Sequence, residues 1–170
     1  TDVLSTLSER EWKCGCAEIA KAAVIDSDDF FFWLSEQASS LAKREQPVVT
    51  EAIARSVIFK ANVVALDTLE SRGVRECLNY GHTFGHAIES VAGYGTFSRG
   101  AAVAEGMRFA ARLSADVLGT GADVVAAQDE LLDSLGLPEL EWTASPEELL
   151  EAMMHDKKVR GGTLRFVLIH

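Results

Sequence analysis

Apolar residues recur every three or four positions along most of the chain, which is the period of helices that bury one face. Between Ser8 and about Val24 this pattern includes Trp12 and Cys16. Glu11 follows Ser8 by three residues, the spacing of a capping box, in which the two side chains bond each other's backbone amides. The sequence therefore predicts a helix from Ser8 to about Val24.

The same pattern predicts six further helices, each bounded by capping residues, glycine or proline. They span residues 28–41, 48–66, 74–91, 101–118, 122–135 and 145–155. Residues 163–169 form a short segment that is strand-like, because it is mostly apolar and contains β-branched residues. The expected fold class is mainly α: a helical bundle with a short β element near the C-terminus.

Several residues in these helices carry expectations about packing. The segment 101–118 is alanine-rich and apolar over a broad face, so it is expected at the centre of the bundle. Gly81 and Gly85 weaken a helix, which indicates that another backbone or a ligand comes close there. The aromatic run from Phe30 to Trp33 is expected in the core or at a contact with another domain.

Composition excludes several classes of protein. The chain carries 26 acidic and 16 basic residues, a formal charge of −10, whereas a nucleic-acid binder needs a basic face. No apolar run reaches the roughly 20 residues of a membrane span, so the expectation is a cytoplasmic protein that binds neither nucleic acid nor membrane. The odd count of three cysteines favours free thiols with structural roles.

Two histidines, His82 and His86, lie four residues apart and would leave the same face of a helix. Such a pair can bind a metal or move protons, or it can be two hydrogen-bonded core histidines. Glu18 and Lys21 likewise share a face, as a functional pair or as a surface ion pair of little energy. The residues alone leave these alternatives open.

Four segments, in this order, resemble the 3-dehydroquinate synthases, which carry out the second step of the shikimate pathway. The chain reads Gly15-Cys16-Ala17-Glu18-Ile19-Ala20-Lys21, then Arg75-Glu76-Cys77-Leu78-Asn79-Tyr80-Gly81-His82-Thr83-Phe84-Gly85-His86, then Gly100-Ala101-Ala102-Val103-Ala104-Glu105-Gly106, then Asp156-Lys157-Lys158-Val159-Arg160-Gly161-Gly162. The likeness runs over nearly the whole chain at close to the family's spacing.

The resemblance implies a role for each residue that matches the family's motifs. It makes Glu18 and His82 ligands of Zn²⁺ or Co²⁺. It places His86, Lys21 and Arg75 among the catalytic residues. The residues that it places against the substrate, a small sugar acid phosphate, are Lys60, Asn79, Lys157 and Lys158.

One position departs from the family pattern. The third metal ligand is expected seventeen residues after His82, and that residue is Arg99. A guanidinium is always cationic and has no lone pair for a metal. His155 could replace this ligand only if the fold brought it near the site. Its place in the segment Met154-His155-Asp156-Lys157 does not favour that alternative. One extra residue also separates Lys60 from Arg75.

Members of this family are about twice as long and place an NAD-binding domain before a helical one. Residues 1–170 are therefore expected to form the C-terminal metal- and substrate-binding domain, as a fragment clipped at both ends and inactive alone. The intact protein would use NAD and a metal to convert 3-deoxy-arabino-heptulosonate 7-phosphate to 3-dehydroquinate and phosphate, as a homodimer. The alternatives are another sugar phosphate cyclase, or a non-catalytic relative that has lost its metal.

Overall fold

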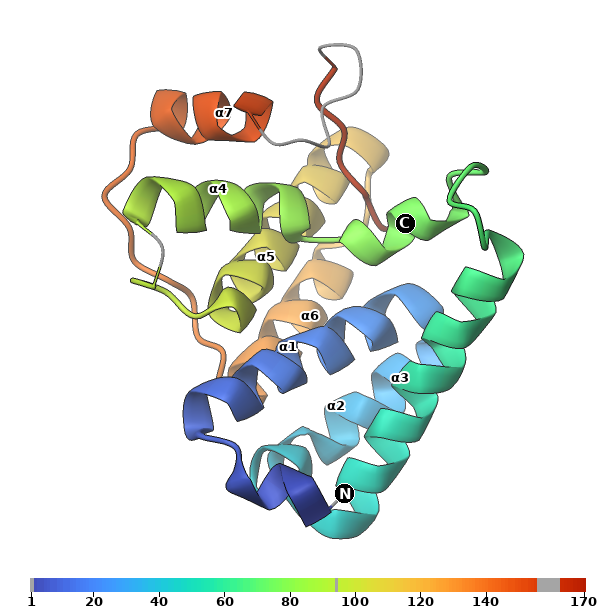
Figure 1. Ribbon diagram of the computed structural model, residues 1–170. Coiled ribbons are helices and arrows are strands. Elements are labelled where there is room, and N and C mark those ends of the chain that lie inside the picture. Colours follow the sequence, from blue (N-terminus) through green and yellow to red (C-terminus); the bar gives the residue numbers. More distant parts are fainter. Residues whose placement is uncertain (1, 94, 156–162) are drawn as a thin grey trace.

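The computed structural model describes residues 2–93, 95–155 and 163–170. These residues form a helical bundle, which confirms the expected fold class (Figure 1). In chain order the elements are η1 (Asp2–Thr6), α1 (Glu9–Asp26), α2 (Asp28–Ala42), α3 (Gln46–Leu66), η2 (Val74–Asn79), α4 (His82–Ala92), α5 (Arg99–Leu118), α6 (Ala122–Ser134) and α7 (Pro146–His155).

Serine side chains begin several of these helices, as the sequence predicts. The Ser8 hydroxyl accepts a hydrogen bond from the Glu11 amide at 3.2 Å, and Ser27 caps α2 in the same way. At the start of α7, Ser145 and Glu148 form a reciprocal capping box, with distances of 3.2 and 2.8 Å. Each bond satisfies an amide that the first helical turn leaves without a partner.

Helix α5 is the centre of the bundle and packs against α1, α4 and α6. In Figure 1 it crosses behind α4 and lies above α1. Its buried residues are mostly small, which allows the neighbouring backbones to approach closely. A side-chain carbon at Gly85 would lie 2.7 Å from the carbonyl oxygen of Ala102, so glycine is required where α4 crosses α5. The expectations for α5 and for the two glycines of the histidine segment are confirmed.

The prediction of one continuous helix from 74 to 91 is wrong. Residues Val74–Asn79 form the 3₁₀ helix η2, Tyr80 and Gly81 form a turn, and Gly81 has a φ of +75°, a conformation that favours glycine. Helix α4 starts only at His82. The break is fixed by packing, because a side-chain carbon on Gly81 would lie 2.8 Å from the Met107 amide of α5.

The predicted strand over 163–169 is also not formed. Thr163 makes an isolated bridge, and residues 164–170 have no regular structure. Their backbone is held by side chains instead: the Ile169 amide donates to the Ser114 hydroxyl at 3.1 Å, and its carbonyl accepts from Thr120 at 2.8 Å. These bonds satisfy the backbone groups that a neighbouring strand would otherwise pair.

Two groups of apolar side chains form the interior. The larger one joins α1, α2, α3, α5 and α6. The smaller one joins α4 and α7 and includes Phe84, which stacks on Phe109 with ring centres 4.1 Å apart. In the aromatic run of α2, Phe30 is in the core and Phe32 is 62% exposed, while contact with another domain stays a prediction. No helix in the described ranges is long and apolar enough to span a membrane.

Candidate active-site cleft

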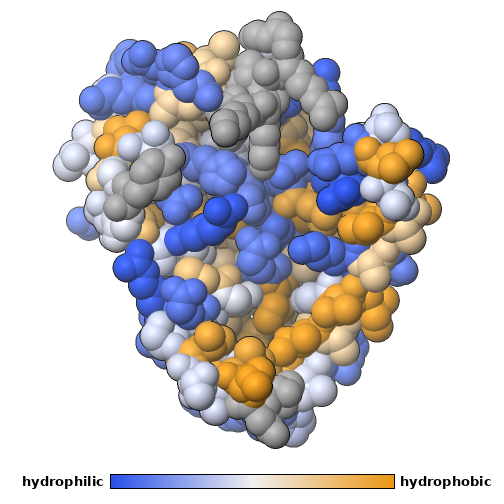
Figure 2. Space-filling model, in the orientation of Figure 1, coloured by the Kyte–Doolittle hydropathy of each residue, from blue (hydrophilic) through white to orange (hydrophobic). Residues whose placement is uncertain are grey.

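Residues from separate parts of the chain line one cleft of about 440 Å³. Helix α1 contributes Glu18 and Lys21, α3 contributes Lys60, α4 begins in it with His82, and α5 begins in it with Arg99. Figure 2 shows hydrophilic surface gathered across the middle of this face, with a hydrophobic strip along α3. The fold therefore brings together four residues that the resemblance assigns to the site and the one that departs from it.

Glu18 and Lys21 form a close ion pair at the edge of the cleft. Their Oε2 and Nζ atoms are 2.7 Å apart, and Lys21 is only 6% exposed while half of the Glu18 side chain is accessible. Burial opposes ionisation of Glu18, but the Lys21 hydrogen bond and charge, with the charges of His82 and Lys60, outweigh it and hold the pKa of Glu18 below its ordinary value. The carboxylate is therefore a permanent anion at neutral pH.

The first residue of α4, His82, is buried and has a fixed orientation. Its Nδ1 lies 3.1 Å from the Tyr80 carbonyl oxygen. A carbonyl can only accept, so Nδ1 carries the proton and the lone pair of the neutral ring is on Nε2. Nε2 lies 3.7 Å from the Glu18 Oε1, so a carboxylate oxygen and an imidazole lone pair face the same point.

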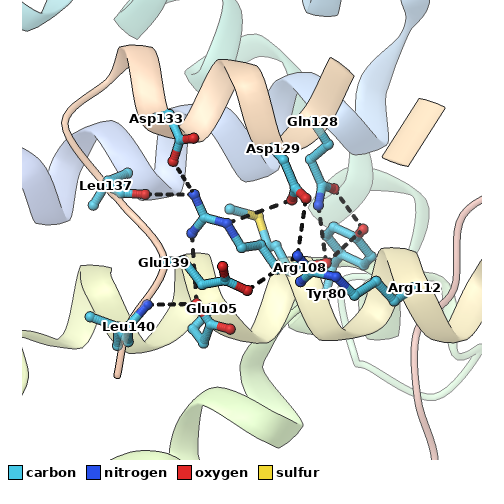
Figure 3. Close-up of polar contacts among 11 residues, drawn as sticks. Tyr80, Glu105, Arg108, Arg112, Gln128, Asp129, Asp133, Leu137, Glu139 and Leu140 are labelled. Atoms are coloured by element: carbon cyan, nitrogen blue, oxygen red, sulfur yellow. Dashed lines mark hydrogen bonds and ion pairs between the residues drawn. The ribbon is translucent and has the colours of Figure 1, made fainter. Parts of the chain in front are cut away.

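The carbonyl that orients His82 is itself held by a buried polar network (Figure 3). The Tyr80 hydroxyl donates to the Gln128 Oε1 of α6 at 2.7 Å, and the Gln128 amide donates to the Met107 carbonyl of α5 at 3.0 Å. Burial raises the pKa of Tyr80, so the phenol stays protonated and keeps donating. Helices α5 and α6 thus fix the residue before the break, and through it the histidine.

A close contact between α1 and α5 positions Arg99. The Gly100 amide donates to the Cys14 sulfur at 3.3 Å, and a side-chain carbon at Gly100 would overlap the Cys14 backbone. Cys14 is one turn before Glu18 on α1. The start of α5 is therefore fixed one helical turn from the carboxylate, and Arg99 lines the cleft there.

Two groups with the chemistry of metal donors, the Glu18 carboxylate and the His82 Nε2, lie 3.7 Å apart at this point. No group of three or more histidine, cysteine, aspartate or glutamate side chains in residues 2–93, 95–155 and 163–170 could hold a metal ion. His155 does not supply the third donor, because it ends α7 and is not among the cleft residues. A catalytic zinc site has three protein ligands and water, so these two groups alone are an incomplete donor set, and Arg99 in the same cleft is a cation that cannot complete it.

Other residues assigned by the resemblance lie near the cleft without lining it. His86 packs its ring edge against His82, with centres 5.5 Å apart. Arg75 is on η2, 3.7 Å from Glu70, and Asn79 lines a separate crevice beside Phe166. Because the chain breaks before α4, Arg75 and Asn79 do not share a helical face with the histidines. Lys157 and Lys158 lie outside the described residues.

Three contributors to the cleft and its support were not singled out from the sequence. Ser56 lines the cleft one turn before Lys60, a spacing that the sequence does display. Gln128 could have been suspected as a polar residue on the apolar face of α6. The supporting role of the Tyr80 hydroxyl had no local signal in the sequence, because its hydrogen-bond partner Gln128 is 48 residues away.

Comparison with known proteins gives consistent relatives. The sequence model of the family described as "3-dehydroquinate synthase C-terminal" matches residues 15–159. The 3-dehydroquinate synthase of Rhodopirellula baltica is 45% identical over 169 residues, which are 99% of this chain and 45% of that protein. The enzyme of the same name from Nitrosococcus oceani is 47% identical over 174 residues, with 99% and 47% covered. The chain spans about half the length of these curated relatives.

Two solved structures share the fold. The 2-epi-5-epi-valiolone synthase from Streptomyces hygroscopicus subsp. jinggangensis, solved with NAD⁺ and Zn²⁺, has a TM-score of 0.85 at 23% identity, over 97% of this chain and 46% of that one. A 2-deoxy-scyllo-inosose synthase, solved with carbaglucose-6-phosphate, NAD⁺ and Co²⁺, has a TM-score of 0.78 at 28% identity, over 94% and 43%.

Proposed function

The chain belongs to the 3-dehydroquinate synthase C-terminal family, and from this membership we propose that it is part of an enzyme that converts 3-deoxy-arabino-heptulosonate 7-phosphate to 3-dehydroquinate and phosphate. Residues 1–170 would form its metal- and substrate-binding domain, with the NAD-binding domain outside this chain. Identity to relatives named for this reaction is 40–47%, against 23–28% for the two solved cyclases that make other products. This difference favours 3-dehydroquinate over the product of another sugar phosphate cyclase.

One observation carries the proposal: Glu18, Lys21, Lys60 and His82, which are up to 64 residues apart, line a single cleft. These are residues to which the family resemblance gives roles with the metal and the substrate. A sugar acid phosphate is anionic and rich in hydroxyls. Cations, a carboxylate and an imidazole are the groups that would bind and orient such a molecule.

The residues of this chain would bind and orient the substrate and move its protons. NAD, held by the other domain, would supply hydride transfer to and from a ring hydroxyl. Lys60 and Lys21 would hold the anionic groups of the substrate. His86 would move a proton during loss of phosphate, because its imidazole lies against the His82 ring and imidazoles can both donate and accept protons.

The metal of the solved cyclases fits this cleft only in part. Glu18 and His82 would be its donors, and Arg99 stands where the family has a third. The residues present do not complete a three-ligand site, so no step of the reaction is assigned to a metal here. Arg99 specifically favours a second candidate function, a relative of the synthases that has lost its metal.

The deciding experiment is phosphate release from the heptulosonate phosphate by the intact gene product with NAD, in zinc and in chelator. Release that requires NAD and stops in Lys60→Ala, but not in a Lys43→Ala control on the exposed end of α2, would support the proposal. Absence of release in both zinc and chelator would reject it. A second copy of the chain as partner and a cytoplasmic location stay predictions.

A further inference from the structure

The structure assigns the cleft a second property: we propose that it binds an oxyanion without metal, with the guanidinium of Arg99 as the positive charge that a metal would otherwise provide. The proposal relies on the proposed function only for the physiological ligand, the phosphate or carboxylate of a sugar acid phosphate. The binding itself depends on charges and geometry that the described residues supply.

The cleft has an excess of positive charge. Glu18 is neutralised by Lys21 at 2.7 Å. Lys60 and Arg99 line the same space, and neither forms an ion pair with a carboxylate of the described residues. Among the described residues the cleft therefore holds one carboxylate, Glu18, against the three cations Lys21, Lys60 and Arg99, within about 440 Å³ of a chain whose formal charge is −10. A low-dielectric cleft of one sign raises the local concentration of ions of the opposite sign.

The position of Arg99 is set by packing rather than by chance exposure. Gly100 is held against Cys14, so the start of α5 cannot move away from α1 without breaking that contact. Glu18 is one turn further along α1, roughly 6 Å away by helical geometry. Arginine offers a planar set of donors that matches the two oxygens of a phosphate or carboxylate.

Arg99 and a divalent cation exclude each other at this point. Arg99 lines the cleft in which the Glu18 carboxylate and the His82 Nε2 lie 3.7 Å apart, and a divalent cation between those two groups would share a half-buried space with the guanidinium, where like charges repel. With arginine present, the cleft keeps a fixed positive charge that chelators cannot remove. Oxyanion binding is therefore expected to be independent of metal.

The test is a titration of the 170-residue chain with inorganic phosphate in chelator, followed by NMR. Wild type is expected to show saturable shifts at the His82 ring and the Arg99 side chain. Arg99→Gln and Arg99→His should each weaken binding by about tenfold, the size of one charge-assisted pair in a partly exposed site. The matched control is Arg112→His, thirteen residues or roughly 20 Å along the same helix.

Zinc separates the two variants. In Arg99→His the third donor is present, so zinc should restore phosphate binding, whereas Arg99→Gln should stay weak. Unsaturable binding by wild type, or equal affinity in wild type and Arg99→Gln, would overturn the proposal. A parallel titration with acetate identifies whether the site prefers phosphate or carboxylate.

The outcome is separable from that of the proposed function. Phosphate binding by the chain, with no turnover by the intact gene product, would reject the synthase activity and keep the oxyanion site. Turnover that requires zinc, with no phosphate binding in chelator, would do the reverse.

Discussion

At the scale of single residues, the chemistry of the cleft depends on which charge stands beside Glu18 and His82. The carboxylate is ionised, and the imidazole offers a lone pair because its Nδ1 proton bonds the Tyr80 carbonyl. Two such donors in one place would attract a metal if a third were available. Arg99 adds a cation to the same cleft.

Arg99→His should raise zinc affinity by orders of magnitude, because it replaces a repelling charge with a third donor. Calorimetric titration of the chain with zinc measures the change, and His82→Ala in the Arg99→His background should abolish the gain. An unchanged affinity in Arg99→His would mean that residue 99 does not face the two donors.

Tyr80→Phe should lower the free energy of unfolding by about 1–3 kcal/mol, because the Gln128 oxygen would lose its donor inside the core. Urea unfolding of Tyr80→Phe, Gln128→Leu and the double variant measures the coupling between the two residues. The double variant should cost less than the sum of the single ones. Strictly additive losses would show that the 2.7 Å contact contributes nothing.

At the scale of elements, the site depends on how α4 and α5 cross and on the turn that precedes η2. Glycines allow the two helices to touch through their backbones. In the turn, the buried Asp67 carboxylate accepts amide hydrogen bonds from Ser71 and Arg72 at 2.9 and 3.0 Å and from Arg75 at 3.4 Å. These contacts set where η2, and therefore Arg75, can lie.

Gly85→Ala should destabilise the chain by about 1–3 kcal/mol, because the new carbon would be forced against Ala102 of α5. Gly15→Ala is the matched control, because nothing lies within 4 Å of that carbon. The control should stabilise α1, by up to about 1 kcal/mol from helix propensity. Urea unfolding of both variants measures the two changes in unfolding free energy. Changes of the same sign would contradict the close crossing of α4 and α5.

Asp67→Asn should destabilise the chain at neutral pH and much less in acid. Burial opposes the charge, but four backbone amides outweigh it and hold the pKa of Asp67 below its ordinary value. A depressed folded-state pKa contributes stability above the unfolded value of about 3.9, and this is lost as pH falls through the folded value. Urea midpoints at pH 7 and near pH 3 test this, with the exposed Asp116→Asn as control. A difference in urea midpoint between wild type and Asp67→Asn that is as large near pH 3 as at pH 7 would contradict this role of the Asp67 charge.

At the scale of the whole molecule, α5, α6 and the segment after α6 are joined by the buried side chain of Arg108 (Figure 3). Its guanidinium lies 2.6 Å from Asp133 and 2.8 Å from the Leu137 carbonyl. It also lies 3.8 Å from Glu105. Burial raises the pKa of Glu105, and the positive charge of Arg108 only partly offsets that effect. The network supports the helices that hold Tyr80 and therefore the cleft.

Arg108→Met should lower the free energy of unfolding by about 3–5 kcal/mol, because it leaves the buried Glu105 and the partly buried Asp129 without their counter-charge and the Leu137 carbonyl without its donor. The control is Arg112→Met, whose ion pairs with Asp129 and Glu139 are partly exposed and should contribute at most about 1 kcal/mol. Chemical denaturation of both variants provides the comparison. Equal losses of unfolding free energy in Arg108→Met and Arg112→Met would show that the buried ion pairs of Arg108 stabilise the chain no more than the exposed ones of Arg112.

The sequence by itself determined the helices, their serine caps and the residue types of the site. Helical period and capping depend on residues three or four apart, so a local pattern contains the information. The caps at Ser8 and Ser145 and the small-residue face of α5 were predictable for this reason.

Only the tertiary structure decided the break before His82, the missing strand and the shared cleft. Gly81 takes a positive φ because α5 leaves no room for a side chain, and Tyr80 is held by Gln128, 48 residues away. Residues 164–169 form no strand because their backbone is held by α5 instead: the Ile169 amide donates to the hydroxyl of Ser114, near the end of that helix. Arg99 lines the same cleft as Glu18 because Gly100 rests on Cys14. Each outcome depends on contacts between distant residues, which a local pattern does not contain.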